Sequence, residues 1–373
     1  MRPNLSWTAL VVLVAWGQAS CRKEHSEGAK PAADAAPVLA ASAGPAPRPA
    51  PPRGGPRVYV SNEDSNDISV IDPKTDTVTG TIFVGKRPRG IRLSPDGQTL
   101  YVALSGSPKD PPVARDGGRP SLPADRAADG IALIDVAQET VIRTIASGRD
   151  PESFDFTPDG KILYASNEET AQASVVDLAT GQVTKTIALD DEPEGVTVSP
   201  TGDVVYITSE AANKVFAVDT RNNKVKASIQ TGPRPRGVVF TSNGARGYIT
   251  EEQGSSISVV DAKRHKIIAH IGLDAPAHKP MGLIASPNGK TVFVTTGRGG
   301  SVVYVDTDTN RIVKKVDEVG TRPWGIGITA DGEKLYTANG PSNDVSVIDV
   351  PAGRVITRIK VGSFPWGIAV SKK

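Results

Sequence analysis

The chain has 373 residues, of which 43 are Lys or Arg and 41 are Asp or Glu, so its formal net charge is +2. This balance excludes a large field of one sign that would attract nucleic acid or anionic lipid, and it leaves only local charge clusters. The 37 Gly and 30 Pro residues, with only 5% aromatic residues, favour many short strands and tight turns over long helices.

Residues 1–20 have the three parts of an export signal. Arg2 supplies the positive charge, and the apolar run from Leu5 to Trp16 is too short for a comfortable membrane span. The residues up to Cys21 resemble a bacterial lipobox, although Gln18 stands where a large apolar residue is expected. Cys21 is the only cysteine, and exported proteins usually avoid a free thiol. We therefore expect export with a lipid on Cys21, and a soluble form cleaved before Ser20 is the alternative.

A spacer and one repetitive domain follow. Residues 21–56 become rich in Pro and Ala, a composition that does not fold and tends to polyproline II. From residue 57 to 373 an apolar run that ends in Asp recurs every 42 to 45 residues, apart from one gap of 63. A period just above 40 with several strand signals predicts a β-propeller, and seven markers predict seven blades. The markers are Asp72, Asp135, Asp177, Asp219, Asp261, Asp306 and Asp349.

Each period divides into four predicted strands, A to D from the centre outwards. In one period they cover residues 90–94, 100–104, 131–135 and 141–145, with a Pro-Asp-Gly turn after the first. The chain begins with a B strand at residues 58–61 and ends with an A strand at residues 367–371. The C-terminal strand should therefore join the N-terminal three strands and close an all-β ring.

Two insertions interrupt the repeat, one at residues 105–128 in a B–C loop and a shorter one near 275–278 in a D–A loop. In an up-and-down meander these two loop types lie on the same face, which we call the top face. Insertions on one face indicate a binding face.

Short motifs resemble the bacterial YVTN family of β-propellers. The namesake motif is approximated at residues 59–62 (YVSN), 164–167 (YASN), 206–209 (YITS) and 336–339 (YTAN), and a P-x-G element recurs at Pro88, Pro193, Pro235, Pro280, Pro323 and Pro365. Segments such as 87–105, 339–350 and 364–370 resemble propellers that are encoded beside PQQ-dependent alcohol-oxidation systems. This resemblance implies a periplasmic accessory role without assigning a reaction.

The positions that vary while the scaffold repeats are the candidates for function. The residue after each of these prolines should stand at the channel mouth, and nearby B–C loops carry further carboxylates. An acidic arc, basic spots and a Trp pair could bind a small polar ligand or a partner peptide. The candidate binding residues are Arg89, Glu152, Glu168, Glu194, Glu210, Arg236, Glu252, Trp324 and Trp366. Salt-bridged loop charges and Trp packing between blades are the structural alternatives.

The repeated Asp residues are expected to cap turns rather than to catalyse. No cofactor motif is present in the sequence, although clustered Glu and Asn oxygens can hold Ca²⁺. We therefore expect a monomeric, non-catalytic binding or accessory propeller of the bacterial envelope, which has a protein or small polar ligand as its partner, does not bind nucleic acid, and contacts the membrane only through the lipid. The alternative is a propeller lactonase-type hydrolase with a metal or carboxylate site in the channel.

Overall fold

The computed structural model describes residues 55–109 and 123–372. The predicted export signal, Cys21, nearly all of the spacer and the central part of the first insertion lie outside the described residues. Within the described ranges no helix is both long enough and apolar enough to cross a membrane.

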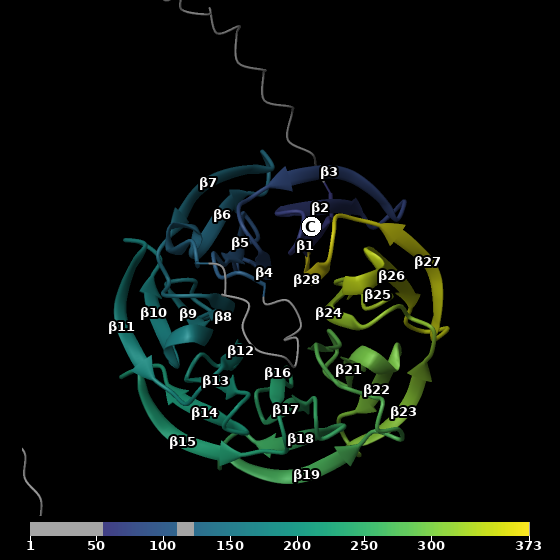
Figure 1. The fold of residues 1–373 in the computed structure, drawn as a ribbon. Helices are drawn as coiled ribbons and strands as arrows, with labels where there is room; N and C mark the ends of the chain where they lie inside the picture. The colour runs from purple at the N-terminus through teal and green to yellow at the C-terminus, as the bar shows by residue number, and fades with distance from the viewer. Residues whose placement is uncertain (1–54, 110–122, 373) are drawn as a thin grey trace, which may run out of the picture. The chain divides into compact units, whose positions relative to one another are not determined.

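Seven four-stranded antiparallel sheets form a ring, as the repeat predicts (Figure 1). The strands of blades 1 to 4, from the centre outwards, are β28 (Pro365–Val370), β1 (Val58–Asn62), β2 (Asp67–Asp72), β3 (Thr77–Phe83); β4 (Pro88–Leu93), β5 (Thr99–Leu104), β6 (Gly130–Asp135), β7 (Thr140–Ile145); β8 (Pro151–Phe156), β9 (Ile162–Asn167), β10 (Gln172–Asp177), β11 (Gln182–Ala188); β12 (Pro193–Val198), β13 (Val204–Ser209), β14 (Lys214–Asp219) and β15 (Lys224–Gln230).

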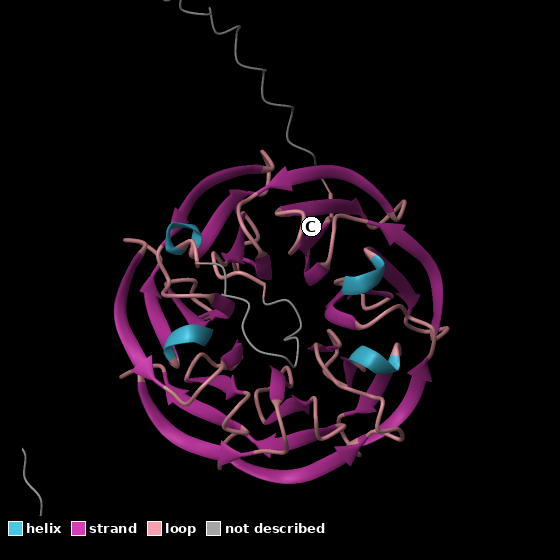
Figure 2. Ribbon diagram, in the orientation of Figure 1, coloured by secondary structure: helices cyan, strands magenta, loops and turns pink. Residues whose placement is uncertain are grey.

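Those of blades 5 to 7 are β16 (Pro235–Phe240), β17 (Arg246–Glu251), β18 (Ser256–Asp261), β19 (Lys266–Gly272); β20 (Leu283–Ala285), β21 (Thr291–Thr295), β22 (Val302–Asp306), β23 (Arg311–Val316); β24 (Pro323–Ile328), β25 (Lys334–Asn339), β26 (Asp344–Asp349) and β27 (Arg354–Lys360). Four 3₁₀ turns complete the described elements, at η1 (Arg126–Ala128), η2 (Glu168–Thr170), η3 (Gly297–Gly299) and η4 (Gly340–Ser342) (Figure 2).

The last strand closes the ring. β28 pairs antiparallel with β1, and Val370 lies opposite Val58. The Tyr336 hydroxyl of blade 7 also donates a 2.8 Å hydrogen bond to Asp76 Oδ1 in the β2–β3 turn of blade 1. The predicted closure is therefore confirmed.

The repeated Asp residues cap turns, as expected. Each accepts a backbone N–H from the C–D turn that follows it, for example Lys74 N–H to Asp72 Oδ1 at 2.8 Å. Between blades, the apolar faces of neighbouring sheets form the core, in clusters such as the one around Tyr206 and Phe240. This core holds the inner strands, and therefore the channel, in a fixed position.

Hydroxyl groups on the B strands fix each inner strand to the neighbouring blade. Ser61 Oγ donates to the Arg89 carbonyl at 2.6 Å, and Thr208 Oγ1 donates to the Arg236 carbonyl at 2.7 Å. Thr295 makes the equivalent 2.8 Å bond to the Trp324 carbonyl. The accepting carbonyls belong to the residues that carry the channel-mouth side chains, so the scaffold determines the backbone position of the candidate site.

Candidate functional site

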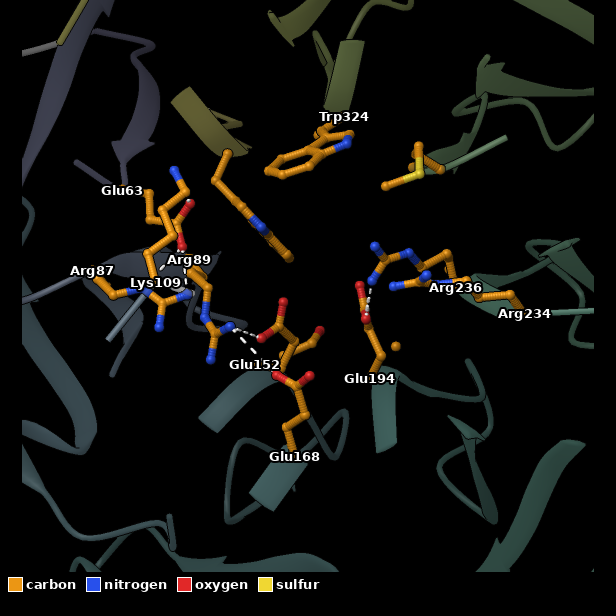
Figure 3. A pocket seen from close by; sticks show the side chains of 17 residues that line it. Glu63, Arg87, Arg89, Lys109, Glu152, Glu168, Glu194, Arg234, Arg236 and Trp324 are labelled. Carbon is orange, nitrogen blue, oxygen red and sulfur yellow. Dashed lines mark hydrogen bonds and ion pairs between the residues drawn. The ribbon is translucent and has the colours of Figure 1, made fainter. Parts of the chain in front are cut away.

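A cavity of about 320 Å³ lies at the mouth of the central channel, where the inner strands of several blades converge (Figure 3). It is lined by seven of the nine predicted binding residues, namely Arg89, Glu152, Glu168, Glu194, Arg236, Trp324 and Trp366. A volume of this size is within the range of small-molecule sites.

Local backbone geometry aims these side chains. In six blades the residue before the inner-strand Pro has a positive φ, such as 44° at Arg87 and 58° at Arg234. An Asn side chain accepts the N–H of that residue in three blades, as Asn213 does from Arg234 at 2.8 Å. Such backbone strain persists only where the surroundings fix it, and it is frequent at functional sites.

The glycine of P-x-G has a packing role. A Cβ at Gly195 would stand 2.2 Å from the carbonyl oxygen of Arg236 in the next blade. A Cβ at Gly282 or Gly325 would likewise stand 2.3 or 2.4 Å from a carbonyl oxygen of the next blade. Without a side chain at this position, the inner strands approach closely and form a narrow waist below the mouth.

Arg89 forms the first charge cluster. Its side chain is buried, Nη2 lies 2.5 Å from Asp150 Oδ1, and Nη1 forms an ion pair with Glu152. Glu168 is the third carboxylate, 3.6 Å from Nη1, and its side chain is 39% exposed and so reaches water. One guanidinium therefore serves three carboxyl groups and cannot neutralise all of them.

Because carboxyl groups outnumber cations in this cluster, one carboxyl group can keep its proton. Burial raises the pKa of Glu152 well above its usual range; Arg89 opposes this shift and the charge of Glu194 adds to it. Burial also raises the pKa of Glu168. Burial therefore favours the protonated form of Glu152, while Glu168 is a more exposed carboxyl group beside it.

Arg236 forms the second cluster. Its Nη1 forms ion pairs with Glu194 and Glu210, and its Nε lies 3.0 Å from Glu252 Oε2. Arg234 Nε lies 2.7 Å from Glu210 Oε2. Glu210 and Glu252 therefore do not line the cavity; they lie behind Arg236 and orient it. They form the salt bridges of the structural alternative, but they are buried rather than solvated.

Here, too, three carboxyl groups outnumber the cations. Burial disfavours the charged form of Glu194, but Arg236 and a hydrogen bond with Glu210 outweigh burial and lower its pKa. Burial and the charge of Glu194 raise the pKa of Glu210 to about 11. The proton of this cluster therefore resides on Glu210, and Glu194 faces the cavity as a carboxylate.

The other side of the mouth is aromatic. The rings of Trp324 and Trp366 meet edge to face with centroids 6.3 Å apart. The ring centroids of Phe364 and Trp324 are 5.5 Å apart. The Arg322 guanidinium lies 4.7 Å from the Trp324 ring centroid. The two Trp side chains therefore line the cavity and pack against each other across two blades, and Trp324 lies across the cavity from Glu152 and Glu168 (Figure 3).

Two buried donors at the cavity have no hydrogen-bond partner among the described residues, Arg89 Nε and Trp324 Nε1. Buried polar groups in native proteins are nearly always paired with protein, water or ligand. A bound carbonyl or hydroxyl oxygen would satisfy these donors.

The sequence did not single out Arg87, Arg234 and Lys109, which also line the cavity. The repeated R-P-R-G tetrapeptide at 87–90 and 234–237 could have indicated the two arginines. Lys109 lies in the insertion, which has no counterpart in other repeats; it contacts Asp64 Oδ1 at 2.8 Å and lies 3.2 Å from the Phe364 ring centroid. The described part of the insertion therefore reaches the top face, as predicted.

No metal centre is apparent. Across residues 55–109 and 123–372, no group of three His, Cys, Asp or Glu side chains is arranged to hold a metal ion. The carboxyl groups of the mouth surround guanidinium groups instead. The arrangement combines a buried carboxyl group with a raised pKa, further carboxyl groups, guanidinium groups and an aromatic wall, which can bind a polar ring and transfer protons to it.

Residues 58–200 match a family model described as "Lactonase, 7-bladed beta-propeller". This range is less than half of the chain and covers β1 to β12. Among curated proteins, the chain is 32% identical to Antigen Lp49 of Leptospira interrogans over 111 residues, 30% of this chain and 23% of that protein. The chain spans less than a quarter of the length of the curated relatives it matches.

Two solved structures share the fold. The periplasmic gluconolactonase of Pseudomonas aeruginosa has a TM-score of 0.68 at 19% identity, covering 84% of this chain and 98% of that one. A putative 6-phosphogluconolactonase of Bacteroides fragilis has a TM-score of 0.68 at 17% identity, covering 85% and 98%. At these identities the likeness shows the seven-bladed fold, which hosts many functions.

Proposed function

We propose that the protein hydrolyses a lactone, a cyclic ester, in the cavity at the channel mouth. The observation that carries this proposal is the convergence of Glu152, Glu168 and Glu194 with the guanidinium groups of Arg89 and Arg236 on one small cavity. The partial match to a lactonase family model and the fold shared with gluconolactonases support it.

The geometry suggests a role for each group. The Arg89 guanidinium, which lies beside Glu152 and Glu168, stabilises the negative charge that develops on the ester carbonyl oxygen. Glu168, which reaches water, takes a proton as a water molecule attacks the carbonyl carbon. Glu152 then gives its proton to the ring oxygen as the ring C–O bond breaks, and the product is a hydroxy acid. Glu194 and Arg236 bind the hydroxyl groups of the substrate.

The non-catalytic binding function that the sequence favoured uses the same face. The comparisons favour the lactonase alternative, and the carboxylate form of that alternative suits the cavity, since its acids surround guanidinium groups. Export, a lipid on Cys21 and a location in the bacterial envelope belong to the proposal and place the reaction outside the cytoplasm. The association with quinoprotein oxidation systems stays a prediction.

The test is a lactone screen with the purified protein. We expect release of acid from δ-gluconolactone or γ-butyrolactone above the buffer rate, followed with a pH indicator. Glu168→Gln should lower kcat by about 10²- to 10⁴-fold, the usual contribution of a general base.

Glu169→Gln is the matched control. Glu169 is the next residue, but it pairs with Arg126 and accepts a 2.7 Å hydrogen bond from Ser107 Oγ, and it does not line the cavity. Its rate should stay near that of the native protein. If lactones bind without being hydrolysed, the site is a binding site only. Equal loss in both variants would contradict the role of Glu168.

A further inference from the structure

A second cavity of about 990 Å³ occupies the channel below the mouth. It shares Trp366 with the mouth cavity. It also shares the small residues that follow the channel-mouth positions, such as Gly195 and Gly325. The two cavities therefore adjoin at the waist, and both are lined by its glycines. A ligand that is bound at the mouth can extend through the waist into the lower channel.

The wall below the waist is mainly aliphatic on one side. Inner strands of blades 5, 6, 7 and 1 contribute partly buried side chains that line the cavity, namely Val239, Leu283, Ile284, Ile328 and Ile368. Each packs against an interblade core and lines the channel as well. Ile328 and Ile368 lie on the two inner strands that carry Trp324 and Trp366, so the aromatic side of the mouth continues downwards into this aliphatic wall.

On blades 2 to 4 the fifth residue of the inner strand is polar. Each of these side chains already has a partner within the protein. Arg92 Nη1 lies 3.5 Å from Asp155 Oδ1, and Asp155 Oδ2 accepts the Val198 N–H at 2.8 Å. Thr197 Oγ1 donates to the Val238 carbonyl at 2.7 Å. These groups need no polar ligand, whereas the aliphatic side chains gain free energy when an apolar group displaces water from them.

We propose that the lower channel binds an alkyl chain of the substrate, so that the protein acts on alkyl-substituted lactones. The ring occupies the mouth between the carboxyl groups and the Trp pair, and the chain passes through the waist along the aliphatic wall. This proposal rests on the proposed lactone hydrolysis for its head group. Burial of each methylene increases affinity by up to about fourfold.

The experiment compares γ-butyrolactone, γ-octalactone, γ-decalactone and γ-dodecalactone as substrates. We expect kcat/KM to rise about two- to fourfold with each added methylene until the channel is filled. Ile328→Gln and Ile284→Gln, which place an amide in the wall, should abolish most of this rise and leave γ-butyrolactone hydrolysis unchanged. Ile356→Gln on the outer strand β27, where Ile356 is 42% exposed, is the matched control and should retain the full rise.

A binding assay separates this proposal from the catalytic one. Trp324 and Trp366 are the only tryptophans after the export signal, so intrinsic fluorescence reports on the waist. We expect 5-alkyl-pyrrolidin-2-ones, the lactam counterparts, to bind more tightly as the chain lengthens. Lactam binding that depends on chain length without lactone hydrolysis would overturn the catalytic function and support the channel site. Hydrolysis or binding that is indifferent to chain length would overturn the channel site alone.

Discussion

Glu210→Gln tests the proton that the structure assigns to the second charge cluster. The Glu210 side chain is 4% exposed, forms an ion pair with Arg236 and lies 2.7 Å from Arg234 Nε. Burial and the charge of Glu194 raise its pKa to about 11. Glutamine has the shape of the protonated acid, and it can keep the hydrogen bond to Glu194 without any ionisable proton.

The sign of the pH dependence follows from linkage. Between the unfolded pKa of about 4.3 and the folded pKa, folded Glu210 holds a proton that the unfolded chain has released. Its contribution to stability is therefore complete below pH 4 and falls by about 1.4 kcal/mol per pH unit as the pH rises. The slope depends only on the proton being held, and it applies across pH 6 to 8 because a folded pKa of about 11 lies above this range.

Urea unfolding at pH 6, 7 and 8 measures this slope directly. We expect the free energy of unfolding of the native protein to fall by about 2–3 kcal/mol more than that of Glu210→Gln over these two pH units. Glu333→Gln, at an exposed position in the β24–β25 turn, controls for the loss of one carboxyl group. Parallel curves for the native protein and Glu210→Gln would refute the assignment of the proton.

Other predictions test the scaffold. Gly195→Ala places a Cβ 2.2 Å from the Arg236 carbonyl and should cost about 1–3 kcal/mol in urea unfolding, whereas Gly272→Ala, with nothing within 4 Å, should unfold like the native protein. Truncation after Gly362 removes β28 and should sharply lower the thermal unfolding midpoint; an unchanged midpoint would contradict ring closure. Tyr336→Phe removes a hydroxyl that links blades 7 and 1, and should lower the free energy of unfolding by about 1 kcal/mol.

The sequence predicts the scaffold well because each blade repeats the same local physics. Asp72 and its six counterparts accept turn N–H groups, and a B strand without an A strand at residue 58 requires a partner from the other end of the chain. The channel-mouth positions were also predictable, because the residue after each inner-strand Pro lies at the start of an innermost strand. Six of the nine candidate residues line one cavity for this reason, and Glu168 reaches the same cavity from a B–C loop.

Contacts between residues of different repeats are harder to predict from the sequence. Glu210 and Glu252 belong to B–C loops, and the period places them near the mouth, but it does not show that they point at Arg236 instead of the cavity. Asp150 is one residue before the Pro of its own blade, yet its partner, Arg89, belongs to the preceding blade. A repeat pattern gives the position of each residue within a blade, whereas these pairs depend on the angle between blades.

The acid and base roles depend on the same inter-blade geometry. Glu152 and Glu194 occupy equivalent positions after the Pro of adjacent inner strands, so sequence alone gives them the same environment. Their pKa values move in opposite directions because burial outweighs the charge of Arg89 at Glu152, whereas Arg236 and a hydrogen bond with Glu210 outweigh burial at Glu194. Two identical side chains in equivalent positions thus differ in how readily they give up a proton, and the difference lies in their neighbours on adjacent blades.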